Sequence, residues 1–126
     1  MDVDAFFEEM PFADLLGIEL TEIREGHAAG RIGMREALSW DADRTVAHGG
    51  VTFTLADTVG GAALVSLVEQ PVPTIDVRID FLEAGTGDLL AEADVVRLGE
   101  DVGVVDVGVF TEETHVADVR GVYKTG

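Results

Sequence analysis

The chain has 126 residues, of which 47% are hydrophobic and 26% charged, a composition typical of one globular domain rather than of a disordered segment. Its 25 acidic and 8 basic residues give a net charge of −17, so the surface repels phosphate backbones and anionic lipids and disfavours nucleic acid or membrane partners. The sequence has no cysteine, which excludes disulfides, thiolate metal sites and a cysteine nucleophile.

The acidic residues are scattered along the chain, and Lys124 is the single lysine. This pattern is typical of halophilic proteins, whose self-repulsion is quenched when molar salt shortens the screening length to about 3 Å. We interpret it as a solvated acidic surface, with an acidic docking patch as the alternative. The N-terminus is acidic and lacks the basic region of a signal peptide, so we expect a cytoplasmic protein.

The first 16 residues form a predicted N-terminal helical segment. Phe6, Phe7 and Met10 recur at helical spacing, which predicts a short amphipathic helix over residues 2–10 that stops at Pro11. A further helical turn is expected at residues 14–17.

Residues 18–34 alternate weakly around Glu25-Gly26, which predicts two strands joined by a turn. A loop follows over residues 35–47, with Trp40 at its middle. Trp40 either lines a ligand pocket or packs in the core or an interface, as single tryptophans commonly do.

Residues 51–68 contain only one charge, Asp57. The length would suit a membrane span. The glycine, alanine and threonine content, the central acid and the lack of basic flanks instead favour a buried central helix. Gly60-Gly61 within it costs roughly 1 kcal/mol per glycine relative to alanine, which close packing against a sheet would offset.

From Pro73 onward the pattern has a period of two, beginning with Ile75, Val77, Ile79 and Phe81. Turns at 85–88 and 99–101 separate three further strands, at 89–98, 102–110 and 116–123. The short connections predict that all four strands form an antiparallel meander. The whole chain, residues 1–126, is therefore predicted to be one α+β domain in which an antiparallel sheet of about five to six strands wraps a long central helix.

Asp57 is the first candidate for chemistry. An ionised carboxylate in apolar surroundings loses hydration worth several kcal/mol unless it is paired, and no basic residue lies nearby in the sequence. The functional interpretation is a general base or nucleophile whose reactivity is raised by partial burial. The structural alternative is a carboxylate that braces the helix through Thr54 or Thr58.

The tripeptide His48-Gly49-Gly50 is the second candidate. Two glycines allow close approach of a ligand to the backbone, and the free N–H groups at the start of the helix attract negative charge. They can hold a thioester carbonyl and the oxyanion formed from it. A plain turn before a helix is the alternative. His48 is either a general base or a brace for this loop, and we favour the brace.

The spacing of these candidates has a geometric consequence. Asp57 lies eight residues beyond Gly49, which is roughly 12 Å along a helix. One carbonyl cannot contact both groups of the same helix, so if both act on one bond they belong to different subunits. The sequence then predicts a site at a two-fold interface, with a homodimer as the minimal unit.

The string Ala47-His48-Gly49-Gly50-Val51-Thr52-Phe53-Thr54-Leu55-Ala56-Asp57-Thr58 resembles the signature of the PaaI-like branch of hotdog thioesterases, in which HGG, four residues and L-A-D follow one another. The resemblance extends more loosely over residues 10–124. It implies the hotdog fold, dimers that often pair into tetramers, and hydrolysis of acyl-CoA thioesters. It places the catalytic acid on Asp57 and the carbonyl-polarising N–H on Gly49, with His48 and Gly50 shaping that loop. It also places a hydroxyl near the attacking water on Thr74.

One position departs from this family pattern. Many members carry an asparagine six residues before the histidine, where this chain has Ala42 and contains no asparagine at all. Ser39, Asp41 or Asp43 are the candidate substitutes. For the phosphates of coenzyme A the candidate contacts are Arg44, Arg78 and Arg97, each of which could equally be an ion-pair partner on the surface.

The predicted function is that of an acyl-CoA thioesterase for a small or aromatic/medium-chain acyl group, without cofactor or metal. His27, His48 and His115 lack metal-ligand spacing, and neither a G-x-S-x-G elbow nor a P-loop is present. The alternative is a non-catalytic hotdog module that binds acyl-CoA or another apolar ligand. A hotdog dehydratase or hydratase is less favoured, because a histidine-plus-acid pattern on the helix is absent.

Overall fold

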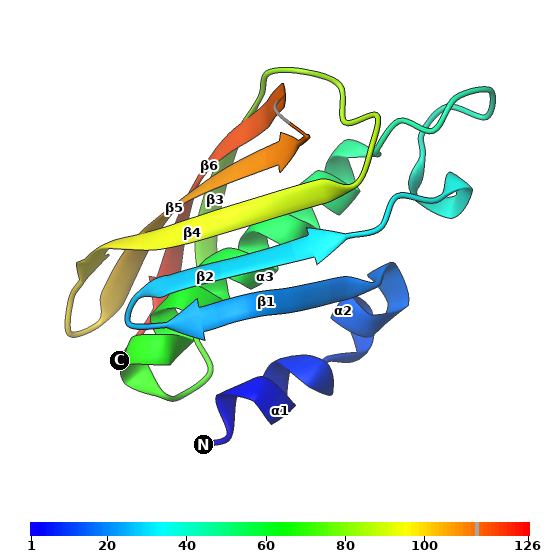
Figure 1. Ribbon diagram of the computed structural model, residues 1–126. Coiled ribbons are helices and arrows are strands. Elements are labelled where there is room, and N and C mark those ends of the chain that lie inside the picture. Colours follow the sequence, from blue (N-terminus) through cyan, green and yellow to red (C-terminus); the bar gives the residue numbers. More distant parts are fainter. Residues whose placement is uncertain (113) are drawn as a thin grey trace.

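The computed structural model describes residues 1–112 and 114–126. A single long helix lies against one face of a curved antiparallel sheet (Figure 1). The helices are α1 (Val3–Glu8), α2 (Pro11–Leu16), the short 3-10 helix η1 (Glu36–Leu38) and the central α3 (Gly49–Val68). The strands are β1 (Ile18–Arg24), β2 (His27–Ile32), β3 (Thr74–Phe81), β4 (Leu89–Leu98), β5 (Val102–Thr111) and β6 (Thr114–Lys124). The predicted α+β fold, a long helix wrapped by an antiparallel sheet, is confirmed.

The N-terminal segment forms two short helices where the sequence predicted one helix and an extra turn. Pro11 ends the first segment as expected, but it also starts α2 at the first helical position, where its missing N–H is not needed. The turn between β1 and β2 is confirmed: Glu25 and Gly26 both have positive φ, at 46° and 82°, as tight hairpin turns require.

The sheet order is β1-β2-β4-β5-β6-β3. The predicted meander is correct for β4, β5 and β6 but wrong for β3, which pairs with β6 through partners such as Val77 and Gly121. The place beside β4 is taken by β2, with Ile32 opposite Leu89. The loop over residues 82–88 is longer than a tight hairpin turn, so it allows β3 to lie at the far edge of the sheet.

The core lies between α3 and the sheet. Leu55, Val59 and Leu64 are fully buried on α3, and they belong to one hydrophobic cluster with the buried strand residues Ile32 and Val105. By length and composition α3 could cross a membrane, but 61% of its apolar window is buried inside the protein. This burial fits the central core helix that the sequence predicted.

Gly60 within α3 makes room for one aromatic ring. A Cβ atom at Gly60 would lie 2.6 Å from the hydroxyl oxygen of Tyr123, a residue that is only 1% exposed. Tyr123 comes from β6 and packs across the helix at this point. Any larger residue at position 60 would clash with Tyr123, so glycine is needed there. This is the close helix–sheet packing that the sequence predicted.

Candidate active site

The N-terminus of α3 presents an available backbone donor. His48 is the N-cap residue in an extended conformation, and its Nδ1 atom accepts a hydrogen bond of 2.8 Å from the Gly50 N–H. His48 thus holds the turn into the helix. Gly49 is the first helical residue, and none of the hydrogen bonds found among residues 1–112 and 114–126 uses its N–H. Such an N–H points out along the helix axis toward any electronegative ligand.

Asp57 lies in the middle of α3 and is only half-buried. The hydroxyl of Thr74, the first residue of β3, donates a hydrogen bond of 2.8 Å to Asp57 Oδ1. Thr54 instead donates to the carbonyl oxygen of Gly50, at 2.8 Å, so it does not brace the carboxylate. None of the hydrogen bonds found among residues 1–112 and 114–126 uses the second carboxylate oxygen, which can accept one from a water molecule or a substrate.

Tyr123 is a site residue that the sequence analysis did not identify. Its hydroxyl donates a hydrogen bond of 3.0 Å to the backbone carbonyl oxygen of Asp57. Burial, together with the negative charge of nearby Asp57, raises the pKa of Tyr123 well above its usual value. The hydroxyl is therefore a neutral, permanent donor. The available signal was Gly60-Gly61, which indicates that a bulky group approaches the helix there.

A pocket of about 270 Å³ opens beside the Asp57 carboxylate. Its polar lining residues include Asp57, Thr58 and Thr74. The remaining lining residues are Phe6, Phe7, Met10, Gly61, Val65, Pro71, Val72, Pro73 and Tyr123. An apolar cavity with a few polar groups at one place is the usual form of a site for a small organic ligand.

A second hollow, of about 290 Å³, lies at the N-terminal end of α3. Trp40, Arg44, Gly49 and Phe81 are among its lining residues. The structure thus brings Trp40 together with Gly49, and Asp57 together with Thr74, but it leaves these two pairs roughly 12 Å apart along one helix. The chain therefore presents the two pairs at separate places on α3.

The loop before α3 contains Ser39, Asp41 and Asp43, the candidate substitutes for the family asparagine. Ser39 Oγ lies 2.9 and 2.8 Å from the carbonyl oxygens of Asp41 and Arg44, and accepts a hydrogen bond of 2.9 Å from the Val46 N–H. The Asp43 backbone N–H, followed by the Arg44 groups, lowers the pKa of Asp41 below its usual value. Ser39 and Asp41 therefore hold the loop together, while Ala42 is exposed.

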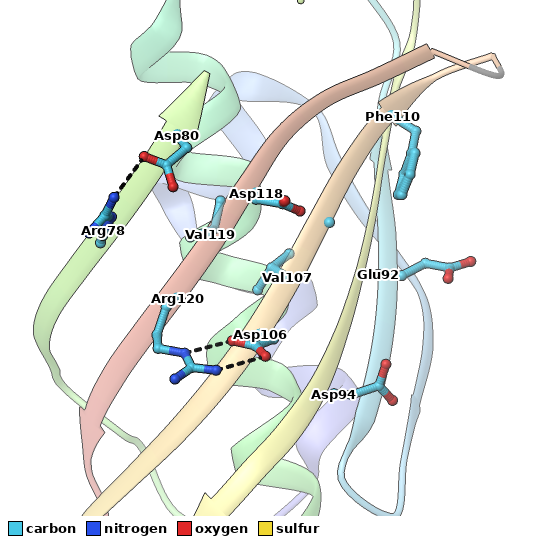
Figure 2. A pocket seen from close by; sticks show the side chains of 11 residues that line it. Arg78, Asp80, Glu92, Asp94, Asp106, Val107, Phe110, Asp118, Val119 and Arg120 are labelled. Atoms are coloured by element: carbon cyan, nitrogen blue, oxygen red, sulfur yellow. Dashed lines mark hydrogen bonds and ion pairs between the residues drawn. The ribbon is translucent and has the colours of Figure 1, made fainter. Parts of the chain in front are cut away.

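A larger hollow, of about 580 Å³, lies on the outer face of the sheet (Figure 2). Asp106 makes two hydrogen bonds there to Arg120, at 2.8 and 2.9 Å, and Arg78 pairs with Asp80 at 3.4 Å. Acids outnumber arginines among its lining residues by five to two. This hollow would repel the phosphates of a nucleotide-bearing ligand, and Asp57 is not among its lining residues, so it is not the candidate active site.

Comparison with known sequences identifies relatives of this chain. A family model described as the thioesterase superfamily matches residues 45–117, a region that includes Gly49, Asp57 and Thr74. A putative esterase of Halobacterium salinarum is 33% identical over 97% of this chain and 89% of its own length. The medium/long-chain acyl-CoA thioesterase YigI of Escherichia coli is 26% identical over 98% of this chain and 90% of its own.

Comparison with solved structures agrees with the sequence matches. The PaaI protein from the phenylacetic acid degradation operon of E. coli superposes with a TM-score of 0.87 at 29% identity, covering 97% of this chain and 88% of that one. A hypothetical thioesterase from Streptococcus pneumoniae, solved with coenzyme A, superposes with a TM-score of 0.77 at 26% identity, covering 86% of this chain and 85% of the other.

Proposed function

Because the chain belongs to the thioesterase superfamily and is a PaaI-like hotdog protein, we propose that it hydrolyses the thioester bond of an acyl-CoA with a small or aromatic/medium-chain acyl group. The observation that carries the proposal is the Asp57 carboxylate, held by Thr74 beside an apolar pocket of about 270 Å³. The relatives named as acyl-CoA thioesterases and the neighbour solved with coenzyme A support the same substrate class.

In the proposed reaction, Gly49 of one subunit and Asp57 of the other act on the same thioester bond. The Gly49 N–H donates a hydrogen bond to the thioester carbonyl and stabilises the oxyanion that forms from it. Asp57 then acts in one of two ways. As a general base it takes a proton from water, and the resulting hydroxide attacks the carbonyl carbon. The tetrahedral intermediate expels the CoA thiolate, which takes up the proton from Asp57. As a nucleophile its free oxygen attacks directly, CoA leaves as the thiolate, and water hydrolyses the mixed anhydride.

This arrangement requires two subunits, so a homodimer is the proposed minimal unit, and pairing of dimers into a tetramer is proposed with it. Among the described strands, β3 pairs only with β6 and leaves its other edge free. Ile75 and Phe81 on β3 and Leu82 just beyond it are 56%, 55% and 49% exposed. An open strand edge flanked by exposed apolar side chains favours pairing with a second copy across a two-fold axis.

The volume of the pocket limits the size of the acyl group that it can hold. At about 270 Å³ it lies just below the roughly 300 Å³ at which pockets for drug-sized ligands begin. A compact acyl group fits this volume better than a long fatty chain. For the CoA phosphates, Arg44 is the favoured contact of the three arginines named from the sequence, because it lines the hollow at Gly49.

The test is release of free thiol from a series of acyl-CoA substrates, measured at high salt. We expect wild-type turnover of compact acyl-CoAs, and loss of turnover in Asp57→Asn with an unchanged circular dichroism spectrum. Near-normal turnover in the folded Asp57→Asn protein would refute the assignment. Incorporation of oxygen-18 from labelled water into Asp57 during turnover, or trapping of an acyl group on Asp57, would identify the nucleophilic route, whereas the general-base route predicts neither.

The second candidate function is a non-catalytic module that binds acyl-CoA. The observation that favours it is the exposed Ala42, which carries no polar side chain at the position of the family asparagine. Binding of an acyl-CoA without thiol release would support this second candidate over hydrolysis.

A further inference from the structure

The N-terminal segment contributes Phe6, Phe7 and Met10 to the apolar lining of the Asp57 pocket. We propose that Phe6 and Met10, together with the bare position at Gly61, set the length of the acyl chain that the site accepts, and that the accepted chain is an unsubstituted hydrocarbon. This proposal rests on the proposed function, since it assigns the substrate specificity of the same site.

The N-terminal segment is anchored and yet exposes one aromatic ring to the pocket. α1 packs against α3 and β1 (Figure 1), and its N-cap Asp2 accepts a hydrogen bond of 3.1 Å from the Ala5 N–H. Phe7 is only 7% exposed and belongs to the hydrophobic core. Phe6 meets the Phe7 ring edge-on, with centroids 5.1 Å apart, and is only partly buried. Phe7 therefore fixes α1, while Phe6 and Met10 can be changed with less damage to the core.

Gly61 lies one helical turn beyond Asp57, on the lining of the pocket. A Cβ atom there would lie 3.7 Å from Tyr123 Cε2 and 3.7 Å from Val72 Cγ2, which is ordinary van der Waals contact. The protein packing therefore does not demand glycine at this position, in contrast to Gly60. Because Gly61 lines the pocket, a methyl group there would reduce the space beside Asp57 without displacing Tyr123 or Val72. An acyl chain extending from the thioester beside Asp57 would occupy that space.

The apolar lining of the pocket indicates which acyl chains the site accepts. The side chains that line this part of the pocket, Phe6, Met10, Val65 and Val72, are all apolar. A carboxylate or hydroxyl at the end of an acyl chain would lose its hydration against these side chains, and the Thr74 and Tyr123 hydroxyls of the same pocket already donate to Asp57. Hydrocarbon acyl groups, straight or aromatic, are therefore favoured over dicarboxylyl and hydroxyacyl groups.

The experiment compares kcat/KM across straight-chain acyl-CoAs from butanoyl to dodecanoyl in four proteins: wild type, Met10→Ala, Gly61→Ala and Phe12→Ala. Met10→Ala should shift the optimum to longer chains, with a gain of about fourfold for each methylene newly buried. Gly61→Ala should lose about tenfold or more on the longest chain that the wild type accepts, without a fall in its melting temperature. Phe12 is 56% exposed on α2 and outside the pocket, so Phe12→Ala should leave the chain-length profile unchanged.

The same series is measured as Kd in an Asp57→Asn background, so that specificity is read without turnover. If wild type releases no thiol but the Kd profiles move as expected, the hydrolase proposal fails and the pocket assignment stands. If wild type turns over but both variants keep its chain-length profile, the pocket assignment is overturned and the hydrolase proposal stands. Should Met10→Ala fail to fold, Gly61→Ala decides alone, because its added methyl group meets its neighbours only at ordinary distances.

Discussion

Asp57 is held from two sides by hydroxyl groups that belong to different strands. Thr74 on β3 donates to its carboxylate, and Tyr123 on β6 donates to its backbone carbonyl. The first bond orients the side chain, and the second fixes the helix at the residue that carries it. A half-buried carboxylate positioned in this way keeps one free oxygen for a proton or a carbonyl carbon.

Removing the Thr74 hydroxyl should reduce turnover more than stability. We expect Thr74→Val to lower kcat about tenfold or more, because a hydrogen bond to a charged group is worth about 1.5–3 kcal/mol and its loss frees the Asp57 rotamer. Thr74→Ser keeps the hydroxyl and should retain most of the activity. Steady-state kinetics on both variants provide the comparison, and equal kcat values for them would count against a role for this bond.

The residues of the candidate site were only partly predictable from the sequence. Asp57, Gly49 and Thr74 were proposed from the anomaly of a charge in an apolar helix, the glycine pair and the family resemblance, and the structure places Thr74 on Asp57. Tyr123 and Phe6 were not predicted as site residues. Tyr123 lies 66 residues from Asp57 in sequence, and its approach depends on how β6 packs across the helix, which no local pattern encodes.

At the scale of the elements, the long helix and the last three strands follow directly from hydrophobic periodicity. The position of β3 does not, because its alternating pattern is compatible with either neighbour. β3 pairs with β6 at the edge of the sheet, and this pairing brings Thr74 to Asp57 in the middle of α3. The predicted meander placed β3 beside β4. The pairing of β3 with β6, which that prediction missed, is the one that brings Thr74 to Asp57.

The fit of Tyr123 against Gly60 can be measured by a double-mutant cycle. Gly60→Ala should lower the free energy of unfolding by about 1–2 kcal/mol, because overpacking costs more than the gain in helix propensity. In a Tyr123→Phe background the clash with the hydroxyl is gone, so the same substitution should cost at least about 0.5 kcal/mol less. Chemical denaturation of the four proteins gives the coupling, and additive effects would contradict this packing.

For the whole molecule, the dominant feature is its net charge of −17. The outer hollow of the sheet shows the same imbalance locally, with Glu92, Asp94 and Asp118 exposed beside the Asp106–Arg120 pair. We propose that this surface is adapted to high salt, at which repulsion between the carboxylates is screened.

The melting temperature should therefore rise steeply with potassium chloride. Between about 0.1 M and 1 M salt the screening length falls from about 10 Å to 3 Å. Each kcal/mol gained in stability would raise Tm by about 4 °C for a domain of this size. Thermal unfolding over this range, with sucrose as an uncharged control, provides the measurement. A Tm that does not change with salt would contradict the proposal.

The shared site is the central claim, and complementation between two inactive variants tests it most directly. Gly49→Pro removes the N–H that we propose polarises the carbonyl, and it keeps the helix start, since proline is favoured at the first helical position and His48 already has the extended conformation that precedes proline. A Cβ atom at this position lies 3.1 Å from Phe81 Cζ, a contact that proline and alanine share. Gly49→Ala, which keeps the N–H, is its control. Asp57→Asn removes the acid.

Each of these two variants alone should be inactive. Refolded together in equal amounts, they should recover about a quarter of the wild-type activity, because half of the dimers are mixed and each mixed dimer regains one intact site. If the mixture stays inactive although mixed dimers form, Gly49 and Asp57 do not act across the subunit interface, and the account of a composite thioesterase site is wrong.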